Sequence, residues 1–415
     1  MFMRFIAPGE IDGTARAPPS KSMMQRALAA ALLADGESVL SNGSDSEDCR
    51  TALTVVRALG ADVDEEAGEV TIRPGAREPA RRLDCGESGT CMRLFAPIAA
   101  LSGQETVLTA RGSLAKRPMG MLEEAVHAFG AKCQTTDGCA PVRVRGPLLG
   151  GTGNVDGSLS SQPISALLIA LPKTARDSVL EVRNPASKPY IDMTLGLLGR
   201  FGAQIDAKKD LTRFEMAGRQ NYDGIRYAVE GDWSGAAFLL VAGAIGGRIR
   251  LLGLDADSKQ ADKAVLDALR QAGAKVRILG TRVQVERGER RPFEFDVSDC
   301  PDLAPSLCAL AAGAPGVSII RGTRRLRIKE SDRAAALREE FGKAGIRIDV
   351  GRDEMRIEGG KIRGADLDSH GDHRIAMAGA LLALESDGGM KLAGEECVSK
   401  SFPDFFTELE KLKRG

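Results

Sequence analysis

The chain has 415 residues, 43% of them hydrophobic, and its 57 Lys and Arg residues balance 57 Asp and Glu residues. This length usually divides into two domains, and a zero net charge without a basic block argues against nucleic acid as a main partner. Aromatic residues make up 4% of the chain, with one tryptophan, so platforms that stack bases are not expected.

The N-terminal stretch has no apolar run typical of a signal peptide, and no run reaches the length of a membrane span. The eight cysteines form no C-x-x-C pair, and the histidines are not arranged around them. Reduced thiols, a cytoplasmic location and no bound metal are therefore expected, and His370 with His373 is a weak metal motif.

The first predicted elements are a strand at residues 3–6 and a helix that follows a double proline at residues 18–19. Lys21 and Arg26 stand near the start of this Ala- and Leu-rich helix, where positive charge opposes the helix dipole. A bound anion would explain both cations, and a solvated first turn is the alternative.

One pattern then recurs along the chain: a helical run, a glycine and a short strand. The glycines are spaced 70, 72, 71, 72 and 70 residues apart, at positions 60, 130, 202, 273, 345 and 415. A fixed period of this kind predicts six structural units, and each glycine suits the left-handed end of a helix. A second, apolar helix begins in each unit near residues 20, 88, 160, 231, 301 and 371, and its composition predicts burial.

The last unit lacks its final strand, so we expect strand 3–6 to complete it and to bring the two chain ends into one lobe. The predicted lobes are residues 1–19 with 231–415, and residues 20–230. Each contains three units, with buried helices inside and sheets outside. Trp233 lies near one crossover between the lobes.

Polar residues occupy the same phase of the repeat, just before its helices. Equal phase predicts that many helix N-termini and cations point toward one cleft between the lobes, which suits a substrate with several phosphates or carboxylates. Any single residue of this set also fits a cap or a surface salt bridge, and Ser88, Thr90 and Asp332 are candidates for caps alone. His127 is expected to be structural.

Six motifs in order identify a resemblance to the 5-enolpyruvylshikimate-3-phosphate synthase family, from residue 6 to about 409. They are Pro19-Ser20-Lys21-Ser22 with Arg26, Ser160-Ser161-Gln162, Ser187-Lys188-Pro189-Tyr190-Ile191-Asp192, Lys329-Glu330-Ser331-Asp332-Arg333, Asp372-His373-Arg374-Ile375-Ala376-Met377 and Lys400-Ser401-Phe402-Pro403-Asp404. The resemblance implies a two-lobed, inside-out α/β barrel fold of six β-α-β-α-β-β units.

The resemblance also implies transfer of the enolpyruvyl group of phosphoenolpyruvate to the 5-hydroxyl of shikimate 3-phosphate, without a cofactor, by a monomer. Residues carried over for shikimate 3-phosphate are Lys21, Ser22, Arg26, Ser160, Ser161, Gln162, Ser187, Asp302 and Lys329. Those for phosphoenolpyruvate are Lys21, Gly89, Arg117, Gln162, Arg333, Arg374 and Lys400. Asp302 is expected to take the hydroxyl proton, while Glu330 with Lys21 handles the proton on carbon.

Two positions depart from the family pattern. Glu87 stands where the family usually has Asn, and Arg325 stands where many members have Asn. The first change puts affinity for phosphoenolpyruvate and its mimic glyphosate in question, and the second does so for contacts with shikimate 3-phosphate.

Two other functions stay open at this point. The sister enolpyruvyl transferase acting on UDP-N-acetylglucosamine usually carries a reactive Cys in the loop before its Arg-Pro pair, and residues 111–118 contain none. A non-catalytic anion-binding protein is the other alternative. Retention of both Asp302 and Glu330 argues against it, because anion binding needs no carboxylates.

Overall fold

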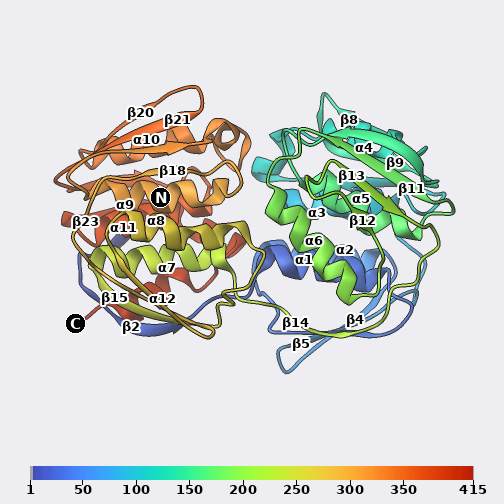
Figure 1. The fold of residues 1–415 in the computed structure, drawn as a ribbon, viewed down its shortest axis with the longest axis horizontal. Helices are drawn as coiled ribbons and strands as arrows, with labels where there is room; N and C mark the ends of the chain where they lie inside the picture. Colours follow the sequence, from blue (N-terminus) through green and yellow to red (C-terminus); the bar gives the residue numbers. More distant parts are fainter. Residues whose placement is uncertain (1–2, 415) are drawn as a thin grey trace. The chain divides into compact units, whose positions relative to one another are not determined.

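The computed structural model describes residues 3–414, which divide into two compact lobes (Figure 1). Of these residues, the terminal lobe contains 3–20 and 230–414, and the middle lobe contains 21–229. Each division lies one residue from the boundary expected from the sequence.

One helix of each repeat is buried along nearly its whole length. These helices are α1 (Lys21–Leu32), α3 (Gly89–Ala99) and α5 (Gln162–Ala170) in the middle lobe, and α7 (Trp233–Gly246), α9 (Ala304–Ala312) and α11 (His373–Ala383) in the terminal lobe. Their small and aliphatic residues allow close packing on all sides, and the predicted buried helices are confirmed.

The second helix of each repeat buries one side only. These helices are α2 (Glu47–Ala58), α4 (Met121–His127), α6 (Lys188–Arg200), α8 (Val265–Gln271), α10 (Arg333–Lys343) and α12 (Phe405–Leu412). Gly60, Gly130, Gly202, Gly273 and Gly345 follow the first five of them with φ between +82° and +103°, a region that favours glycine. This confirms the expected left-handed helix ends, and Gly415 lies outside the described residues.

Each repeat also builds one small sheet. The middle lobe has sheets β14-β3-β5-β4, β6-β7-β9-β8 and β10-β11-β13-β12. Their strands are β3 (Ser38–Ser41), β4 (Asp62–Glu66), β5 (Glu69–Arg73), β6 (Arg82–Asp84), β7 (Glu105–Thr109), β8 (Lys132–Thr136), β9 (Cys139–Arg145), β10 (Gly151–Asp156), β11 (Ser178–Arg183), β12 (Asp206–Ala207), β13 (Arg213–Met216) and β14 (Arg226–Ala228).

The terminal lobe has sheets β2-β15-β17-β16, β18-β19-β21-β20 and β22-β23-β1. Their strands are β1 (Met3–Ile6), β2 (Ile11–Arg16), β15 (Gly247–Leu252), β16 (Lys275–Leu279), β17 (Arg282–Glu286), β18 (Glu294–Asp296), β19 (Gly316–Arg321), β20 (Arg347–Val350), β21 (Glu354–Gly359), β22 (Arg363–Asp368) and β23 (Asp387–Ala393).

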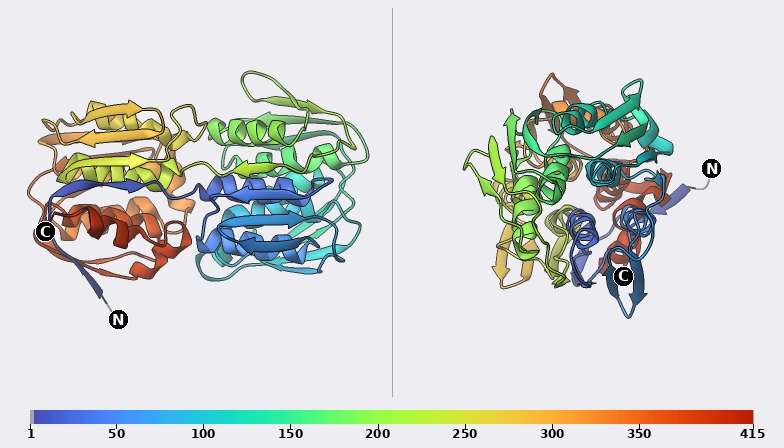
Figure 2. Two further views of the ribbon diagram at one scale, coloured as in Figure 1. Left: turned by 90° about the horizontal axis from the view of Figure 1, so that it is seen from below. Right: turned by 90° about the vertical axis from the view of Figure 1, so that its right-hand side faces the viewer.

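In all six sheets a parallel pair of strands is joined by an antiparallel partner. The parallel partner of β3 is β14, from the far end of the middle lobe, and that of β15 is β2, from the start of the chain. Each lobe is thereby closed by a strand that is remote in sequence (Figure 2).

Strand β1 pairs with β23 in antiparallel register, Met3 opposite Ala393 and Ile6 opposite Met390. The prediction that the N-terminal strand completes the last repeat is therefore confirmed. Within residues 3–414 this sheet has three strands where the other sheets have four.

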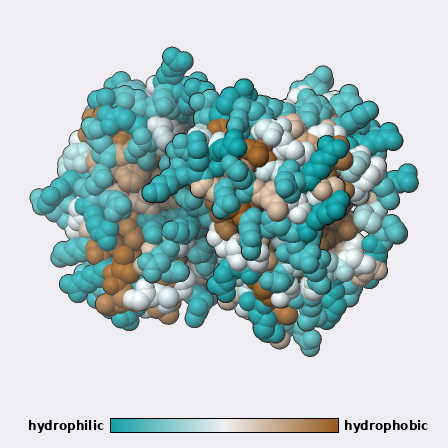
Figure 3. Space-filling model, turned by 45° about the vertical axis from the view of Figure 1, so that its right-hand side comes forward, coloured by the Kyte–Doolittle hydropathy of each residue, from teal (hydrophilic) through white to brown (hydrophobic). Residues whose placement is uncertain are grey.

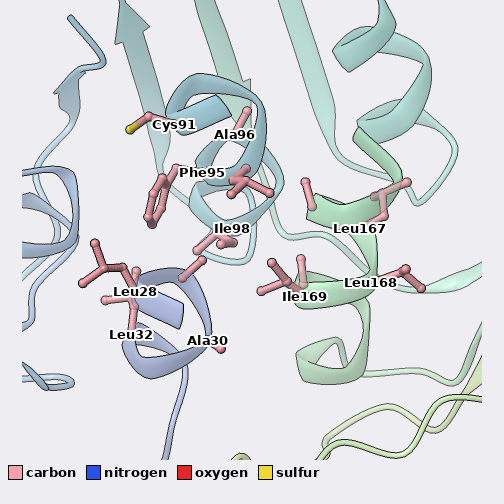
Figure 4. Packing of buried hydrophobic residues seen from close by; sticks show 14 of the residues in the cluster. Leu28, Ala30, Leu32, Cys91, Phe95, Ala96, Ile98, Leu167, Leu168 and Ile169 are labelled. Carbon is pink, nitrogen blue, oxygen red and sulfur yellow. The ribbon is translucent and has the colours of Figure 1, made fainter. Parts of the chain in front are cut away.

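The core of the middle lobe lies where its three buried helices meet. Figure 4 shows Leu28 of α1, Phe95 and Ile98 of α3, and Ile169 of α5 pointing toward one another. The face drawn in Figure 3 is covered largely by hydrophilic residues, with small apolar patches. Among residues 3–414, no helix is long and apolar enough to cross a membrane.

Candidate active site

Lys21 is the first residue of α1, and its ammonium is already paired. Its Nζ donates to Oδ2 of Asp48, on α2, at 2.9 Å, and both side chains are largely buried. A cation at a helix N-terminus opposes the helix dipole. Asp48 compensates this charge and fixes the direction of the Lys21 side chain.

Arg26 lies one turn further along α1 and is 1% exposed. Its Nε donates to Oγ1 of Thr194, on α6, at 2.9 Å, and its guanidinium also donates to the Ser22 carbonyl at 2.9 Å. Burial lowers the pKa of Arg26 to about 10. Both contacts are to neutral oxygens, so neither compensates the charge of the guanidinium.

Gly89 begins α3 beside two guanidinium groups. A Cβ atom at this position would lie 2.9 Å from the Arg117 guanidinium and 3.1 Å from that of Arg93. Arg117 directly follows η1 (Gly112–Lys116). The missing side chain of Gly89 therefore leaves room for both cations at the start of the helix.

The amide of Gln162, the first residue of α5, joins α5 to α3. Its oxygen accepts from Arg93 at 2.8 Å, and its nitrogen donates to the Thr90 hydroxyl at 2.8 Å. Thr90 thus contacts a predicted site residue rather than acting as a cap alone. Ser88 is a cap, because its hydroxyl accepts from the backbone N–H of Cys91 at 3.3 Å.

Three predicted serines lie at the starts of α5 and α6. The Ser160 hydroxyl accepts from the Gln162 N–H at 3.2 Å, while Ser161 and Ser187 are 4% and 5% exposed. Ser187 precedes α6 with φ +51°, a left-handed conformation that is costly for a residue with a side chain. This left-handed residue directly precedes α6.

Glu87, the first departure from the family pattern, binds within its own lobe. Its Oε2 accepts from the backbone N–H of Ser113 at 3.2 Å and from the Ser113 hydroxyl at 3.0 Å. These contacts tie the carboxylate to the first turn of η1. Glu87 therefore supports the segment that leads to Arg117.

In the terminal lobe, Asp302 of η4 (Pro301–Leu303) is surrounded by three cations. Its Oδ1 accepts from Lys329 at 3.2 Å and from Arg333 at 2.7 Å, and its Oδ2 lies 3.3 Å from an Arg374 nitrogen. Burial alone would raise the pKa of Asp302, but Arg374, Lys329 and Arg333 outweigh it and hold that pKa well below the usual range.

Arg333, the first residue of α10, is buried and bonded to three carboxylates. It donates to Asp372 at 2.7 Å, to Glu330 at 2.6 Å and to Asp302 at 2.7 Å. Burial lowers the pKa of Arg333, but Asp372, Glu330 and Asp302 outweigh burial and raise it. This network fixes Glu330 beside Asp302.

Arg374 lies in the first turn of α11 and is 5% exposed. One of its nitrogens donates to the Ser234 hydroxyl at 2.8 Å and another to the Asp302 carbonyl at 3.3 Å. Lys400, the last residue of η6 (Glu395–Lys400), is also 5% exposed. Burial lowers the pKa of Lys329, with Asp302 acting in the opposite direction.

In the terminal lobe, one network joins Asp302, Lys329, Glu330, Arg333 and Arg374. In the middle lobe, Lys21, Arg26 and Gln162 make separate contacts with Asp48, Thr194 and Arg93. That the residues of the two lobes form a cleft stays a prediction. Arg117, Lys329 and Lys400, expected at the starts of surface helices, lie instead in or directly after the 3₁₀ turns η1, η5 (Arg324–Ile328) and η6.

Sequence reasoning missed the residues that hold the predicted ones. Thr194 contacts Arg26, and Ser234 contacts Arg374. Arg325 donates to the Ser298 carbonyl on its own lobe. His127 accepts from the Cys133 N–H at 3.0 Å, so its expected structural role is confirmed.

The sequence model of EPSP synthase (3-phosphoshikimate 1-carboxyvinyltransferase) matches residues 6–409. The chain belongs to the EPSP synthase family. Proteins named 3-phosphoshikimate 1-carboxyvinyltransferase resemble it along nearly their whole length. That of Korarchaeum cryptofilum is 37% identical, covering 98% of this chain and 97% of that protein, and that of Thermococcus kodakarensis is 39% identical, covering 97% and 98%.

Solved structures agree with this family. An EPSP synthase from Acinetobacter baumannii has a TM-score of 0.81 at 28% identity, covering 99% of this chain and 98% of that one. The enolpyruvyl transferase NikO from Streptomyces tendae has the same TM-score at 20% identity, covering 99% and 97%, which shows the fold alone. The expected fold and the resemblance to the EPSP synthase family are confirmed, and the sugar-nucleotide alternative is not favoured.

Proposed function

We propose that this EPSP synthase family chain transfers the enolpyruvyl group of phosphoenolpyruvate to the 5-hydroxyl of shikimate 3-phosphate. The products are 5-enolpyruvylshikimate 3-phosphate and inorganic phosphate, on the shikimate pathway to chorismate. The observation that carries the proposal is the family match over residues 6–409, which includes Asp302 among three cations. The reaction needs no metal or organic cofactor.

Each substrate is assigned a set of binding residues, most of which are cations or hydroxyl donors suited to an anion. The residues proposed to bind shikimate 3-phosphate are Lys21, Ser22, Arg26, Ser160, Ser161, Gln162, Ser187, Asp302 and Lys329. Those proposed to bind phosphoenolpyruvate are Lys21, Gly89, Arg117, Gln162, Arg333, Arg374 and Lys400. Guanidinium groups suit this task because they bind carboxylate and phosphate in two-pronged fashion. The attraction between a buried cation and an anionic substrate is also screened less by water than at the surface.

Asp302 takes the proton of the 5-hydroxyl as that oxygen attacks C2 of phosphoenolpyruvate. The three cations on Asp302 keep its pKa low before substrate arrives. Anionic substrates compete for Lys329, Arg333 and Arg374, and each cation that turns to a substrate releases part of the charge on Asp302. The pKa of Asp302 then rises, and the carboxylate becomes a better base.

Glu330, with Lys21, handles the proton on carbon. C3 of phosphoenolpyruvate gains a proton as the tetrahedral intermediate forms and loses one as phosphate leaves. Glu330 accepts a hydrogen bond from Arg333 at 2.6 Å, which orients its carboxylate. The arginines stabilise the negative charge on the leaving phosphate.

We also propose that the chain acts as a monomer in the cytoplasm. The eight cysteines are free thiols, as a reducing compartment would leave them.

The proposed function is tested by phosphate release from phosphoenolpyruvate with either of two acceptors. Shikimate 3-phosphate should support release, and UDP-N-acetylglucosamine should not. Release with the sugar nucleotide alone would assign the chain to the sister reaction, and release with neither acceptor would favour the non-catalytic alternative.

A further inference from the structure

The fourth repeat carries a polar group that faces Arg374. Ser234, in the first turn of α7, accepts from an Arg374 nitrogen at 2.8 Å through its hydroxyl. The backbone N–H of Ser234 donates to Oδ1 of Asp232 at 2.8 Å. Because the N-cap residue fixes this turn, the Ser234 hydroxyl has a defined position beside the guanidinium.

Behind Ser234 lies a second carboxylate, that of Asp262, on η3 (Ala261–Ala264). Asp262 is 2% exposed, and the Ser234 hydroxyl donates to it. A hydroxyl has one proton to give. Donation to Asp262 therefore turns the lone pairs of Ser234 toward Arg374, and the three groups form a directed relay from guanidinium to hydroxyl to carboxylate.

Asp262 has an electrostatically unfavourable position. Asp302, Asp232 and the Cys300 thiol face it, with Arg374 as the compensating cation. Burial, followed by the charge of Asp302, raises the pKa of Asp262 to about 6. A buried carboxylate among other carboxylates lowers the free energy of unfolding. Stability of the fold therefore does not explain why Asp262 stands at this position.

The position of Asp262 in the repeat supplies another reason. Arg117, Lys329 and Lys400 all lie in or directly after the 3₁₀ turn before the second helix of their repeats. Asp262 lies in the equivalent turn of the fourth repeat, before α8. This turn thus contains a buried carboxylate, next to Lys263, and that carboxylate acts on Arg374.

We propose that Asp262 is a positioning residue for the transfer reaction, holding Arg374 through the Ser234 hydroxyl in the orientation that receives phosphoenolpyruvate. This inference rests on the proposed function, because Arg374 is assigned there to phosphoenolpyruvate. Asp262 itself touches no substrate. Its loss lets the Ser234 hydroxyl rotate and Arg374 turn further toward Asp302.

The test is a double-mutant cycle on Asp262 and Ser234. Asp262→Ala and Ser234→Ala should each raise the KM for phosphoenolpyruvate about tenfold, the usual effect of one hydrogen bond to a charged group. The KM for shikimate 3-phosphate should stay within about twofold. Because both residues act through one relay, the KM for phosphoenolpyruvate of the double variant should not exceed that of the more affected single variant. Asp262→Asn keeps an acceptor for the hydroxyl and should restore most of the affinity.

Lys263→Ala is the matched control, because Lys263 lies in the same turn but donates to the Ala256 carbonyl. It should change Tm without changing the KM for phosphoenolpyruvate. Asp262→Asn should raise Tm at pH 8, where ionised Asp262 opposes burial, and leave Tm unchanged well below pH 4.

An unchanged KM for phosphoenolpyruvate in Asp262→Ala, or fully additive effects in the double variant, would overturn the inference. Calorimetric titration of phosphoenolpyruvate alone gives the same comparison of variants without turnover. Wild-type inactivity with shikimate 3-phosphate would instead count against the proposed function. Equal affinity of wild type and Asp262→Ala in the titration would overturn the inference alone.

Discussion

At the scale of single residues, the main feature is a carboxylate that three neighbouring cations hold in its charged form. Asp302 accepts from Lys329 and Arg333 and lies 3.3 Å from Arg374. We propose that an anionic substrate recruits these three cations, which would couple substrate binding to proton transfer at Asp302.

Replacing Asp302 by Ala removes the base but keeps the cations. Turnover should fall by about 100-fold or more, the usual contribution of a positioned base, while shikimate 3-phosphate still binds. Steady-state rates and calorimetry measure the two effects separately. Asp296→Asn serves as the control, because Asp296 contacts the Ser298 N–H of a neighbouring turn. Wild-type turnover in Asp302→Ala would refute the assigned role.

The low pKa of Asp302 also predicts how stability depends on pH. A carboxylate whose folded-state pKa lies below its unfolded value stabilises the fold above the unfolded pKa, near pH 4. That contribution is lost as pH falls through the folded-state pKa. The Tm difference between wild type and Asp302→Asn should therefore be constant from pH 8 to about pH 4 and shrink below it. A difference that instead grows on acidification would show that the sign is wrong.

At the scale of elements, the helix starts carry both capping and site residues. Asp332 and Arg333 are neighbours with different tasks. The Asp332 side chain accepts from the Ala335 N–H at 3.1 Å and is exposed, whereas Arg333 is buried among three carboxylates. The contacts of neighbouring polar residues in one motif therefore distinguish a helix cap from a buried ion pair.

Asp332→Ala should cost about 1 kcal/mol of stability, the usual value of an N-cap, and leave kcat unchanged. Urea unfolding and steady-state kinetics test the two parts. Asp332→Ser retains a cap and should recover most of the stability. A large loss of kcat in Asp332→Ala, with Asp332→Ser equally affected, would place Asp332 in the site.

The repeat period was sufficient to predict the six helix pairs and the strand that completes the last unit, because glycine spacing and apolar composition are local signals. The pairing of β2 with β15 and of β14 with β3 could not be predicted, since strand partners remote in sequence leave no local pattern. Contacts such as Lys21 with Asp48 and Arg26 with Thr194 depend on how helices pack. Asp262 was missed because its contact with Ser234, and through it with Arg374, depends on how the helices pack.

At the scale of the whole molecule, each lobe is closed by a strand adjacent to the point where the chain leaves it. Strand β2 precedes the first connection and β14 precedes the second. Trp233 opens α7 soon after the second connection, is fully buried, and donates from its indole to the Asp255 carbonyl at 3.0 Å. Its neighbour Ser234 contacts Arg374.

Trp233 should therefore report on ligand binding. We expect its emission to change when shikimate 3-phosphate and phosphoenolpyruvate bind together, through Ser234 and through movement at the connection. The Asp302→Ala variant allows this titration without turnover. An emission spectrum that stays the same at saturating concentrations of both ligands would contradict the coupling of Trp233 to the site.

The central claim is the identity of the transfer itself, and phosphorus NMR tests it most directly. With shikimate 3-phosphate and phosphoenolpyruvate, the phosphoenolpyruvate resonance should be replaced by that of inorganic phosphate. The phosphomonoester of shikimate 3-phosphate should persist as the shifted signal of the enolpyruvyl product, in equal amount. Loss of the shikimate phosphomonoester, or conversion only when UDP-N-acetylglucosamine replaces shikimate 3-phosphate, would contradict the claim.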